Sequence, residues 1–215
     1  MLDDNELAEA NRTLAESSAP GRIKWARGRF PGSLVLSTSF GIQSAVLLHM
    51  AGTREPRLPV VFVDTGYLFP ETYRFADRLA RELDLDLRVY NPLLTAARQE
   101  ALYGKRWEGD LDDLEAYNRD NKVEPMNRAL RELGANAWIS GLRRSQSRTR
   151  GERAFVEIQN RTCKIYPILD WTDKDVYEYL TRHDLPYHPL WEQGYVSVGD
   201  WHSTRKLTDG LSEEE

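Results

Sequence analysis

The sequence contains almost no cysteine and no long apolar run. Cys163 is the only cysteine among 215 residues, so the chain cannot form an internal disulfide or, by itself, a multi-cysteine zinc or iron–sulfur site. No apolar run approaches the length of a membrane span. The acidic, polar start of the chain (Met1 to Glu6) is unlike a secretory signal. These absences favour a cytoplasmic protein that does not contact a membrane.

The chain also lacks the positive charge of a general nucleic-acid binder. Its net charge is −5, which argues against nucleic acid as a partner. Basic residues nevertheless outnumber acidic ones between Gly141 and Lys164. A basic segment in an acidic protein indicates a local anionic ligand, whereas the ordinary alternative is a solvated basic loop.

The order of apolar patterns predicts an α/β fold. Short apolar runs alternate with helical periodicity, which is typical of a mostly parallel sheet flanked by helices. We expect a single domain over 1–215, with a helical appendage over 1–32. The expected strands are 34–37, 59–63, 86–90, 137–140 and 164–168. The expected helices are 4–17, 22–29, 42–51, 71–83, 95–103, 123–133 and 172–183. Residues 104–122 and 184–215 are expected to be irregular loops that could cover a ligand.

A polar turn follows the first expected strand and precedes a helix. A helix N-terminus binds anions, because its free N–H groups point outward and the helix dipole favours negative charge. The turn matches neither the Walker A spacing nor the GxGxxG pattern. Considered alone, it could also be an ordinary strand-to-helix connection. Its candidate ligand-binding residues are Ser37, Thr38, Ser39, Phe40 and Gly41.

A second candidate turn, Asp64-Thr65-Gly66, follows the next strand. Its carboxylate and hydroxyl could hydrogen-bond a nucleotide, and Gly66 would allow a close backbone approach. Asp, Thr and Gly also favour tight turns, so a simple helix-capping turn is the alternative.

Four cations complete the set of candidates. Lys122 precedes a predicted helix, and Arg143 and Arg144 follow Gly141 at the end of a strand. Arg205 closes an aromatic and glycine-rich stretch. Guanidinium groups suit phosphate and sulfate oxygens, although each cation in isolation could be a surface residue.

Taken together, five segments resemble the thioredoxin-dependent phosphoadenylyl-sulfate reductases of sulfate assimilation. The segments are Ser-Phe-Gly-Ile-Gln at 39–43, Asp-Thr-Gly-Tyr-Leu-Phe-Pro-Glu-Thr-Tyr at 64–73, Lys-Val-Glu-Pro-Met-Asn-Arg-Ala-Leu at 122–130, Gly-Leu-Arg-Arg at 141–144 and Gly-Tyr-Val-Ser-Val-Gly-Asp at 194–200. The resemblance covers nearly the whole chain from about residue 6. It implies an adenine nucleotide α-hydrolase-like fold in which 37–41 is a modified PP-loop.

The resemblance also implies an enzyme without an iron–sulfur cluster. Adenylyl-sulfate reductases of this fold hold a cluster with a Cys-Cys pair and a Cys-x-x-Cys motif. The matching positions here are Tyr117, Asn118, Asp200 and Ser203, and none is a thiolate. We therefore expect no metal and no bound cofactor. The implied substrate is 3′-phosphoadenylyl sulfate (PAPS), reduced by thioredoxin to sulfite and adenosine 3′,5′-bisphosphate.

In this family the nucleophile is a cysteine in a Glu-Cys-Gly-x-His tail. Such a tail would begin after Glu215, so we expect the catalytic cysteine to be absent from this chain. Nothing matches Cys163 to it, and we expect Cys163 to be a half-buried side chain in a strand. By resemblance, Lys122 and the three arginines neutralise the leaving phosphate, and the two polar turns hold the nucleotide. A homodimer is also implied.

Three other functions are considered for the chain. One is adenylyl-sulfate reduction without a cluster. Another is ATP pyrophosphatase activity, but those enzymes usually carry a Ser-Gly-Gly-x-Asp-Ser loop, and 37–41 lacks its acidic residue. The third is an inactive nucleotide-binding protein, if the chain truly ends at Glu215.

Overall fold

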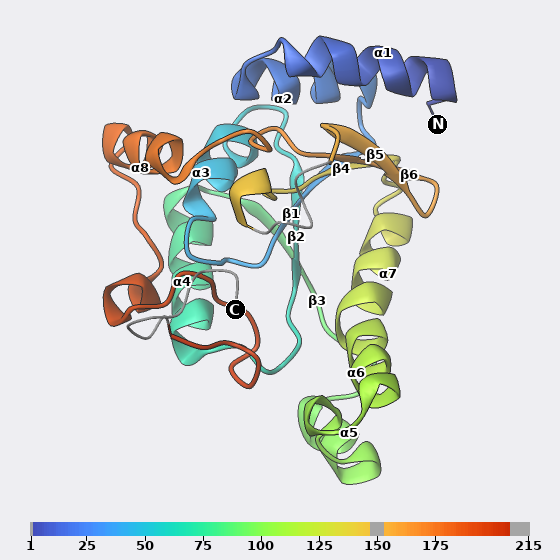
Figure 1. Cartoon of the computed structure of the whole chain (residues 1–215), viewed down its shortest axis with the longest axis vertical. Coiled ribbons are helices and arrows are strands. Elements are labelled where there is room, and N and C mark those ends of the chain that lie inside the picture. Colours follow the sequence, from blue (N-terminus) through green and yellow to red (C-terminus); the bar gives the residue numbers. More distant parts are fainter. Residues whose placement is uncertain (1, 147–152, 207–215) are drawn as a thin grey trace.

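The computed structural model describes residues 2–146 and 153–206. In this part of the chain one six-stranded sheet lies between two layers of helices (Figure 1). The strand order is β3-β2-β1-β4-β6-β5, and all neighbours run parallel except the antiparallel pair β5 and β6. The predicted fold class is therefore confirmed.

The strands and helices of the described residues have the following bounds, in chain order. The strands are β1 Leu34–Thr38, β2 Pro59–Val63, β3 Asp86–Tyr90, β4 Ala137–Ile139, β5 Val156–Gln159 and β6 Thr162–Ile165. The helices are α1 Asp4–Ala15, α2 Ala19–Arg29, α3 Ala45–Leu47, α4 Pro70–Glu82, α5 Ala96–Tyr103, α6 Leu111–Asn118, α7 Glu124–Glu132 and α8 Asp173–Arg182. Two π-helical turns are η1 Leu48–Gly52 and η3 Arg119–Val123, and three 3-10 turns are η2 Arg106–Glu108, η4 Arg144–Gln146 and η6 Pro189–Gln193.

Helices cover both faces of the sheet. Successive strand residues point to opposite faces, so alternate residues of one strand join different apolar clusters. Val35, Val61 and Trp138 pack with residues of α7 on one face. Leu36, Phe62 and Ile139 join the larger core that includes α3, α4 and α8. Figure 1 shows α7 on one side of the strands and these three helices on the other. Burial on both faces explains why the central strands β1, β2 and β4 are rich in apolar residues.

The strand order places a topological switch point between β1 and β4. β1 pairs with β2 on one side and with β4 on the other, and ligands of such sheets bind outside the carboxyl ends of the strands at this point. The Ser37 hydroxyl spans it by donating to the Ile139 carbonyl at 3.1 Å. The fold therefore directs attention to the loops that follow β1, β2 and β4.

Several predicted boundaries are wrong near the N-terminus and in the polar middle of the chain. Pro20 and Gly21 lie in the first turn of α2, which is capped by Ser18 and begins at Ala19 rather than at residue 22. Proline is tolerated there because a first-turn N–H has no intrahelical acceptor. Residues 104–122 are not irregular, because η2, α6 and η3 occupy them. Polar composition conceals α6, of which only Tyr117 is buried.

The β5–β6 hairpin was not predicted. Asn160 and Arg161 both have positive φ, as a two-residue hairpin turn requires, but an Asn-Arg pair lacks the usual glycine signal. The last predicted strand consequently lies earlier, at Thr162–Ile165. Cys163 lies in β6 and is buried rather than half-buried, and burial raises the pKa of its thiol.

Within the described ranges, no helix is both long enough and apolar enough to span a bilayer.

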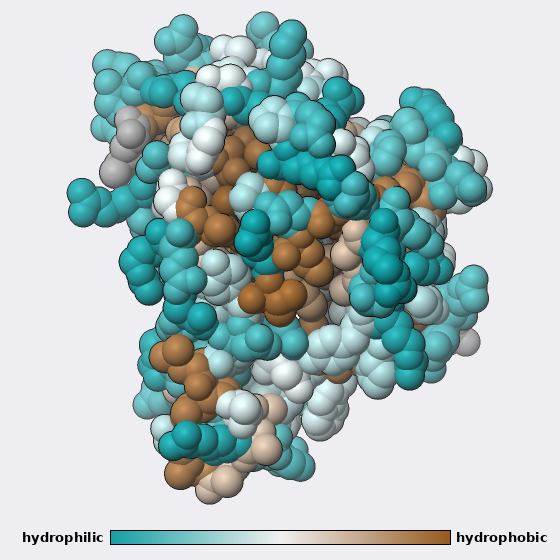
Figure 2. Space-filling model, turned by 180° about the vertical axis from the view of Figure 1, so that it is seen from behind, coloured by the Kyte–Doolittle hydropathy of each residue, from teal (hydrophilic) through white to brown (hydrophobic). Residues whose placement is uncertain are grey.

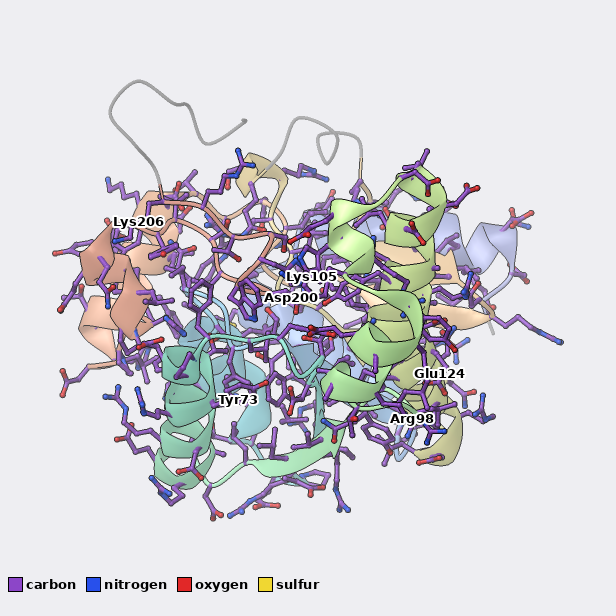
Figure 3. All side chains as sticks on the ribbon, turned by 90° about the horizontal axis from the view of Figure 1, so that it is seen from below. Tyr73, Arg98, Lys105, Glu124, Asp200 and Lys206 are labelled. Atoms are coloured by element: carbon purple, nitrogen blue, oxygen red, sulfur yellow. The ribbon has the colours of Figure 1, made fainter. Side chains whose placement is uncertain are left out.

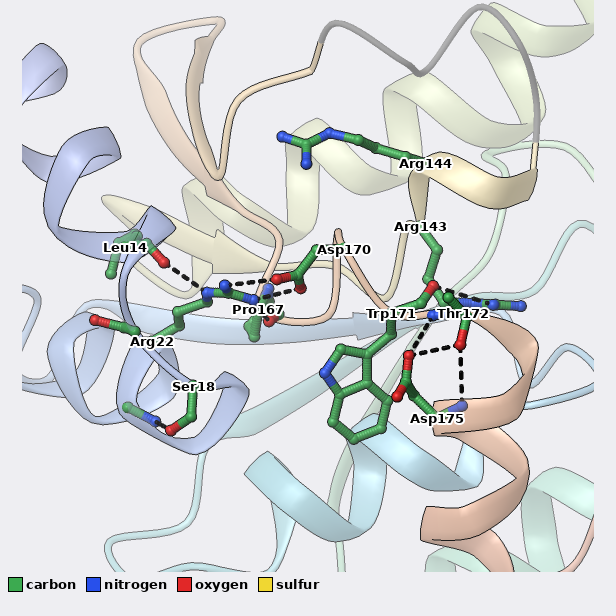
Figure 4. Close-up of polar contacts among 12 residues, drawn as sticks. Leu14, Ser18, Arg22, Arg143, Arg144, Pro167, Asp170, Trp171, Thr172 and Asp175 are labelled. Atoms are coloured by element: carbon green, nitrogen blue, oxygen red, sulfur yellow. Dashed lines mark hydrogen bonds and ion pairs between the residues drawn. The ribbon is translucent and has the colours of Figure 1, made fainter.

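Arg22 joins the N-terminal helices to the segment that follows β6 (Figure 4). Arg22 is 2% exposed, and its guanidinium donates to the carbonyls of Leu14 and Pro167 and to both carboxylate oxygens of Asp170. It also lies 3.9 Å from the centre of the Phe155 ring. A single buried cation thus satisfies acceptors from two distant parts of the chain.

We expect Arg22→Met to lower the free energy of unfolding by about 2–3 kcal/mol, because two carbonyls and a carboxylate lose a charged donor. Urea denaturation at neutral pH measures the change. Arg29→Met is the matched control, since Arg29 forms an exposed pair with Glu6 and should cost less than about 1 kcal/mol. Equal losses in the two variants would contradict this account.

Candidate functional site

The turn after β1 is built around Phe40. Its φ of +49° is uncommon for a residue with a side chain, and the ring is fully buried, edge-on to Phe62 with centroids 4.9 Å apart. The Phe40 amide donates to the Thr38 hydroxyl at 3.0 Å. The buried ring and this hydrogen bond fix the path of the turn, and Ser39 is left exposed.

The next three backbone amides, of Gly41, Ile42 and Gln43, have no acceptor among the residues that the structure describes. They precede α3 and point from a turn at the carboxyl end of β1. Unsatisfied N–H groups at such a position bind anions. The sequence-based prediction of an anion-binding turn at Ser37–Gly41 is therefore compatible with the backbone.

The turn after β2 uses part of its polarity internally. Asp64 Oδ1 accepts from the Gly66 amide at 2.9 Å and from the Tyr73 hydroxyl at 2.8 Å, and Gly66 has a φ of +80°. A side chain on Gly66 would approach Ala96 to 3.3 Å, so glycine is required here for two reasons. Asp64 Oδ1 therefore stabilises a tight turn, which is the alternative that the sequence left open. Asp64 Oδ2 has no partner among the described residues.

Residues 188–204, which we call the strap, connect these two turns. The His188 amide donates to the Ile42 carbonyl at 3.0 Å. Further along, Asp200 bridges to Leu68, and the Trp201 amide donates to the Tyr67 carbonyl at 2.8 Å. The strap thus lies across the loops after β1 and β2, and its residues Pro189–Gln193 form the 3-10 turn η6 rather than an irregular loop.

Asp200 is the polar centre of the strap. Its carboxylate is 2% exposed and accepts from the Thr65 hydroxyl at 2.5 Å and from the Tyr117 hydroxyl at 3.0 Å. Lys122 Nζ lies 2.9 Å from Oδ2. Figure 3 shows Asp200 near the middle of the molecule, seen from below. Burial raises the pKa of Asp200, but the Thr65 hydrogen bond and the Lys122 charge outweigh it, so the net pKa is lowered.

An aromatic cluster surrounds this carboxylate. Trp107 stacks on His202 with centroids 4.0 Å apart, and Tyr67 contacts both rings edge-on. His202 Nε2 lies 3.1 Å from the Tyr117 hydroxyl. Because the Tyr117 hydroxyl donates its proton to Asp200, a hydrogen bond between this hydroxyl and His202 requires a proton on Nε2. Sequence reasoning missed Trp107 and His202 as parts of the site, because their contacts join segments far apart in the chain.

Two positions that match cluster cysteines in the adenylyl-sulfate reductases contact each other here. These are Tyr117 and Asp200, joined by the hydrogen bond already described. Ser203, a third such position, donates to the Asp200 carbonyl at 3.2 Å. Within the described residues, no group of three His, Cys, Asp or Glu side chains is placed to hold a metal ion.

The paired arginines after β4 diverge (Figure 4). Arg143 is buried and donates to Gln43 at 2.5 Å and to Asp173 at 2.7 Å. It therefore links the loop after β4 to the loop after β1. Arg144 instead donates to the Arg153 carbonyl and lies over the Phe155 ring.

The remaining predicted site residues make fewer contacts with the described part of the chain. A side chain at Gly141 would meet Leu47 at an ordinary 3.5 Å. Arg205 is exposed and has no partner in the described part of the chain. Of the basic segment 141–164, Arg148 and Arg150 lie outside the described residues. The structure thus brings together the two polar turns and Lys122, with Arg143 adjoining them, and directs Arg144 elsewhere.

The strap carries a pH-sensitive anchor at His188. This fully buried ring accepts from the Leu190 amide at Nδ1 and lies 3.0 Å from the Thr72 hydroxyl at Nε2. Burial lowers its pKa to about 4. The unfolded chain takes up a proton near pH 6.5 and the folded chain does not. Stability that is present above pH 6.5 is therefore lost as the pH falls toward 4.

We expect His188→Gln to remove this pH dependence. Its unfolding free energy should lie closest to that of the parent protein near pH 4 and furthest below it at pH 7, with the gap changing by up to about 3 kcal/mol. Urea denaturation at pH 7, 5.5 and 4.5 measures the gap. A gap that stays constant across these pH values would show that His188 does not stabilise the fold as a neutral ring.

Comparison with known proteins agrees with this geometry. Residues 33–206 match the family model described as the phosphoadenosine phosphosulfate reductase domain. The chain is 57% identical to phosphoadenosine 5′-phosphosulfate reductase of Alkalilimnicola ehrlichii, covering 100% of this chain and 88% of that protein. It is 54% identical to the reductase of Zymomonas mobilis, covering 97% and 86% respectively.

Comparison with solved structures supports the same family and the same fold. A crystal structure of phosphoadenylyl-sulfate reductase from Candida auris, a phosphate complex, matches with a TM-score of 0.83 and 33% identity, over 95% of this chain and 98% of that one. FMN adenylyltransferase of Candida glabrata shares the fold alone, with a TM-score of 0.62 and 14% identity over 93% of this chain and 66% of that one. The sequence-based resemblance is confirmed: this chain belongs to the phosphoadenosine phosphosulfate reductase family.

Proposed function

We propose that this protein reduces PAPS to sulfite and adenosine 3′,5′-bisphosphate, with thioredoxin as reductant. A thiolate attacks the sulfonate sulfur, the bond from that sulfur to the phosphate oxygen breaks, and the bisphosphate leaves with the bond's electron pair. A thioredoxin thiolate then attacks the resulting S-sulfocysteine at its Sγ, and sulfite leaves. The second thiolate of thioredoxin breaks the mixed disulfide that remains, which releases the enzyme thiolate and leaves thioredoxin as a disulfide. The dithiol of thioredoxin supplies both electrons. By resemblance to the family, the proposed nucleophile is the cysteine of a Glu-Cys-Gly-x-His motif, to which the buried Cys163 is not matched.

The observation that carries this proposal is that the strap contacts both polar turns and also holds Lys122 through Asp200. The free amides of Gly41–Gln43 suit a phosphate. Lys122 is half exposed beside the strap and suits the developing negative charge of the leaving group. The other residues proposed to bind substrate are Ser37, Thr38, Ser39, Phe40, Asp64, Thr65, Gly66, Gly141, Arg143 and Arg205. Arg144 would join them only by releasing the Arg153 carbonyl.

The cluster-free chemistry has its own support. Tyr117 and Asp200 are hydrogen-bonded to each other, at positions where cysteines would hold a cluster in the adenylyl-sulfate reductases. Neither can supply a thiolate. We therefore propose that the substrate carries the additional 3′-phosphate and that the basic segment 141–164 receives it. No bound cofactor is required.

The protein is further proposed to be a cytoplasmic homodimer. Apolar side chains are exposed at the end of the molecule formed by α5 and α6, visible at the lower left of Figure 2. They include Leu102, Leu111 and Leu114, which are 58%, 69% and 41% exposed. Such a surface favours a protein partner. Sedimentation velocity tests the state, and a particle with the mass of one chain, which is 24.8 kDa for these 215 residues, would contradict a dimer.

The full-length protein should release sulfite from PAPS in the presence of reduced thioredoxin, and at least about tenfold more slowly from adenylyl sulfate, because the second nucleotide lacks one charged contact. Sulfite release with each nucleotide measures this. Faster release from adenylyl sulfate, or release of pyrophosphate from ATP, would contradict the proposal.

We expect Lys122→Ala to weaken binding of the sulfonucleotide by about 1–3 kcal/mol, because a charged hydrogen bond is lost. Adenosine binding should change little. Isothermal titration with both ligands measures the difference. An equal loss for the two would mean that Lys122 does not touch the phosphosulfate.

A further inference from the structure

We propose that Asp200 is the positioning residue for Lys122, fixing its ammonium group at the site before any ligand arrives. This inference rests on the proposed function for its ligand, but the contacts that carry it belong to the protein alone. Asp200 does not meet the substrate in this account. It acts through Lys122.

The carboxylate is itself held rigidly. Thr65 donates to Oδ1 and Tyr117 donates to Oδ2, and the two donors come from different segments, the loop after β2 and α6. The Asp200 carbonyl accepts from the hydroxyls of Ser203 and Thr204 at 3.2 and 2.9 Å. Both the side chain and the backbone are therefore fixed, so that Oδ2 is an immobile acceptor.

Lys122 is held by this acceptor while remaining accessible. Its Nζ lies 2.9 Å from Asp200 Oδ2, and its side chain is 46% exposed, compared with 1% for Asp200. Nζ also lies 5.6 Å from the centre of the Tyr117 ring. An ammonium group has three donors, so one pairs with Asp200 and two stay available to an anion.

Ordering the Lys122 side chain before the ligand arrives reduces the conformational entropy that is lost on binding. A free lysine side chain loses rotamer freedom when it is immobilised on a ligand. A lysine already ordered by Asp200 loses less. The buried carboxylate also opposes an incoming anion through its charge, so the two effects on affinity have opposite signs. The two effects are separated by measuring how much Lys122 contributes to ligand affinity, once with Asp200 present and once without it.

A double-mutant cycle makes this separation, with PAPS as the probe and no thioredoxin present. Lys122→Met should weaken binding about tenfold or more in the parent protein. In the Asp200→Asn background the same change should weaken it less than about threefold. The direct charge effect of residue 200 cancels in the comparison. An undiminished or larger effect of Lys122→Met would overturn the proposal.

Tyr117→Phe is a second variant for the case in which Asp200→Asn does not fold. It keeps the Asp200 charge and removes one of the two hydroxyls that hold the carboxylate. The contribution of Lys122 to PAPS binding should shrink in this background too. A full contribution would show that the carboxylate does not need to be held.

A ligand-free readout distinguishes failure of this inference from failure of the proposed function. Acetylation of lysines by an amine-reactive ester, followed by mass spectrometry, should modify Lys122 more slowly than the exposed Lys174, and Asp200→Asn should raise the Lys122 rate at least about threefold. Glu178→Gln is the matched control, because Glu178 is the exposed partner of Lys174. A Lys122 rate unchanged by Asp200→Asn overturns the inference, whether or not PAPS binds.

Discussion

The candidate site depends on one buried carboxylate that accepts from three residues on two separate segments. Asp200 receives the hydroxyls of Thr65 and Tyr117 and the ammonium group of Lys122. A buried carboxylate is stable only when it is hydrogen-bonded and paired. This requirement fixes the strap against the loop after β2 and against the helices before α7, and the geometry of the site follows from it.

The sheet supplies the rest of the architecture. Because β1 lies between β2 and β4, the loops after these strands open at one switch point. The turn at Phe40 presents free amides there, and Arg143 connects it through Gln43 to the loop after β4. An anionic nucleotide would thus meet backbone amides on one side and Lys122 on the other.

The sequence predicted the features that depend on local pattern. Apolar runs identified five strands, and polar turns at the carboxyl ends of two of them identified Ser37–Gly41 and Asp64–Gly66 as candidates. Lys122 was a candidate because it precedes a predicted helix. It could not predict features that depend on contacts between distant segments. Asp200 pairs with Thr65 across 135 residues, and Arg143 is engaged by Asp173. The β5–β6 hairpin and α6 were missed because neither has a strong local signal: one lacks a glycine turn, and the other buries only Tyr117.

A structure of the protein with adenosine 3′,5′-bisphosphate tests the central claim most directly. The account predicts a phosphate against the amides of Gly41–Gln43, with Lys122 still paired to Asp200 and directed at the ligand. A bisphosphate bound elsewhere on the molecule, or a Lys122 turned away from both the ligand and Asp200, would contradict it.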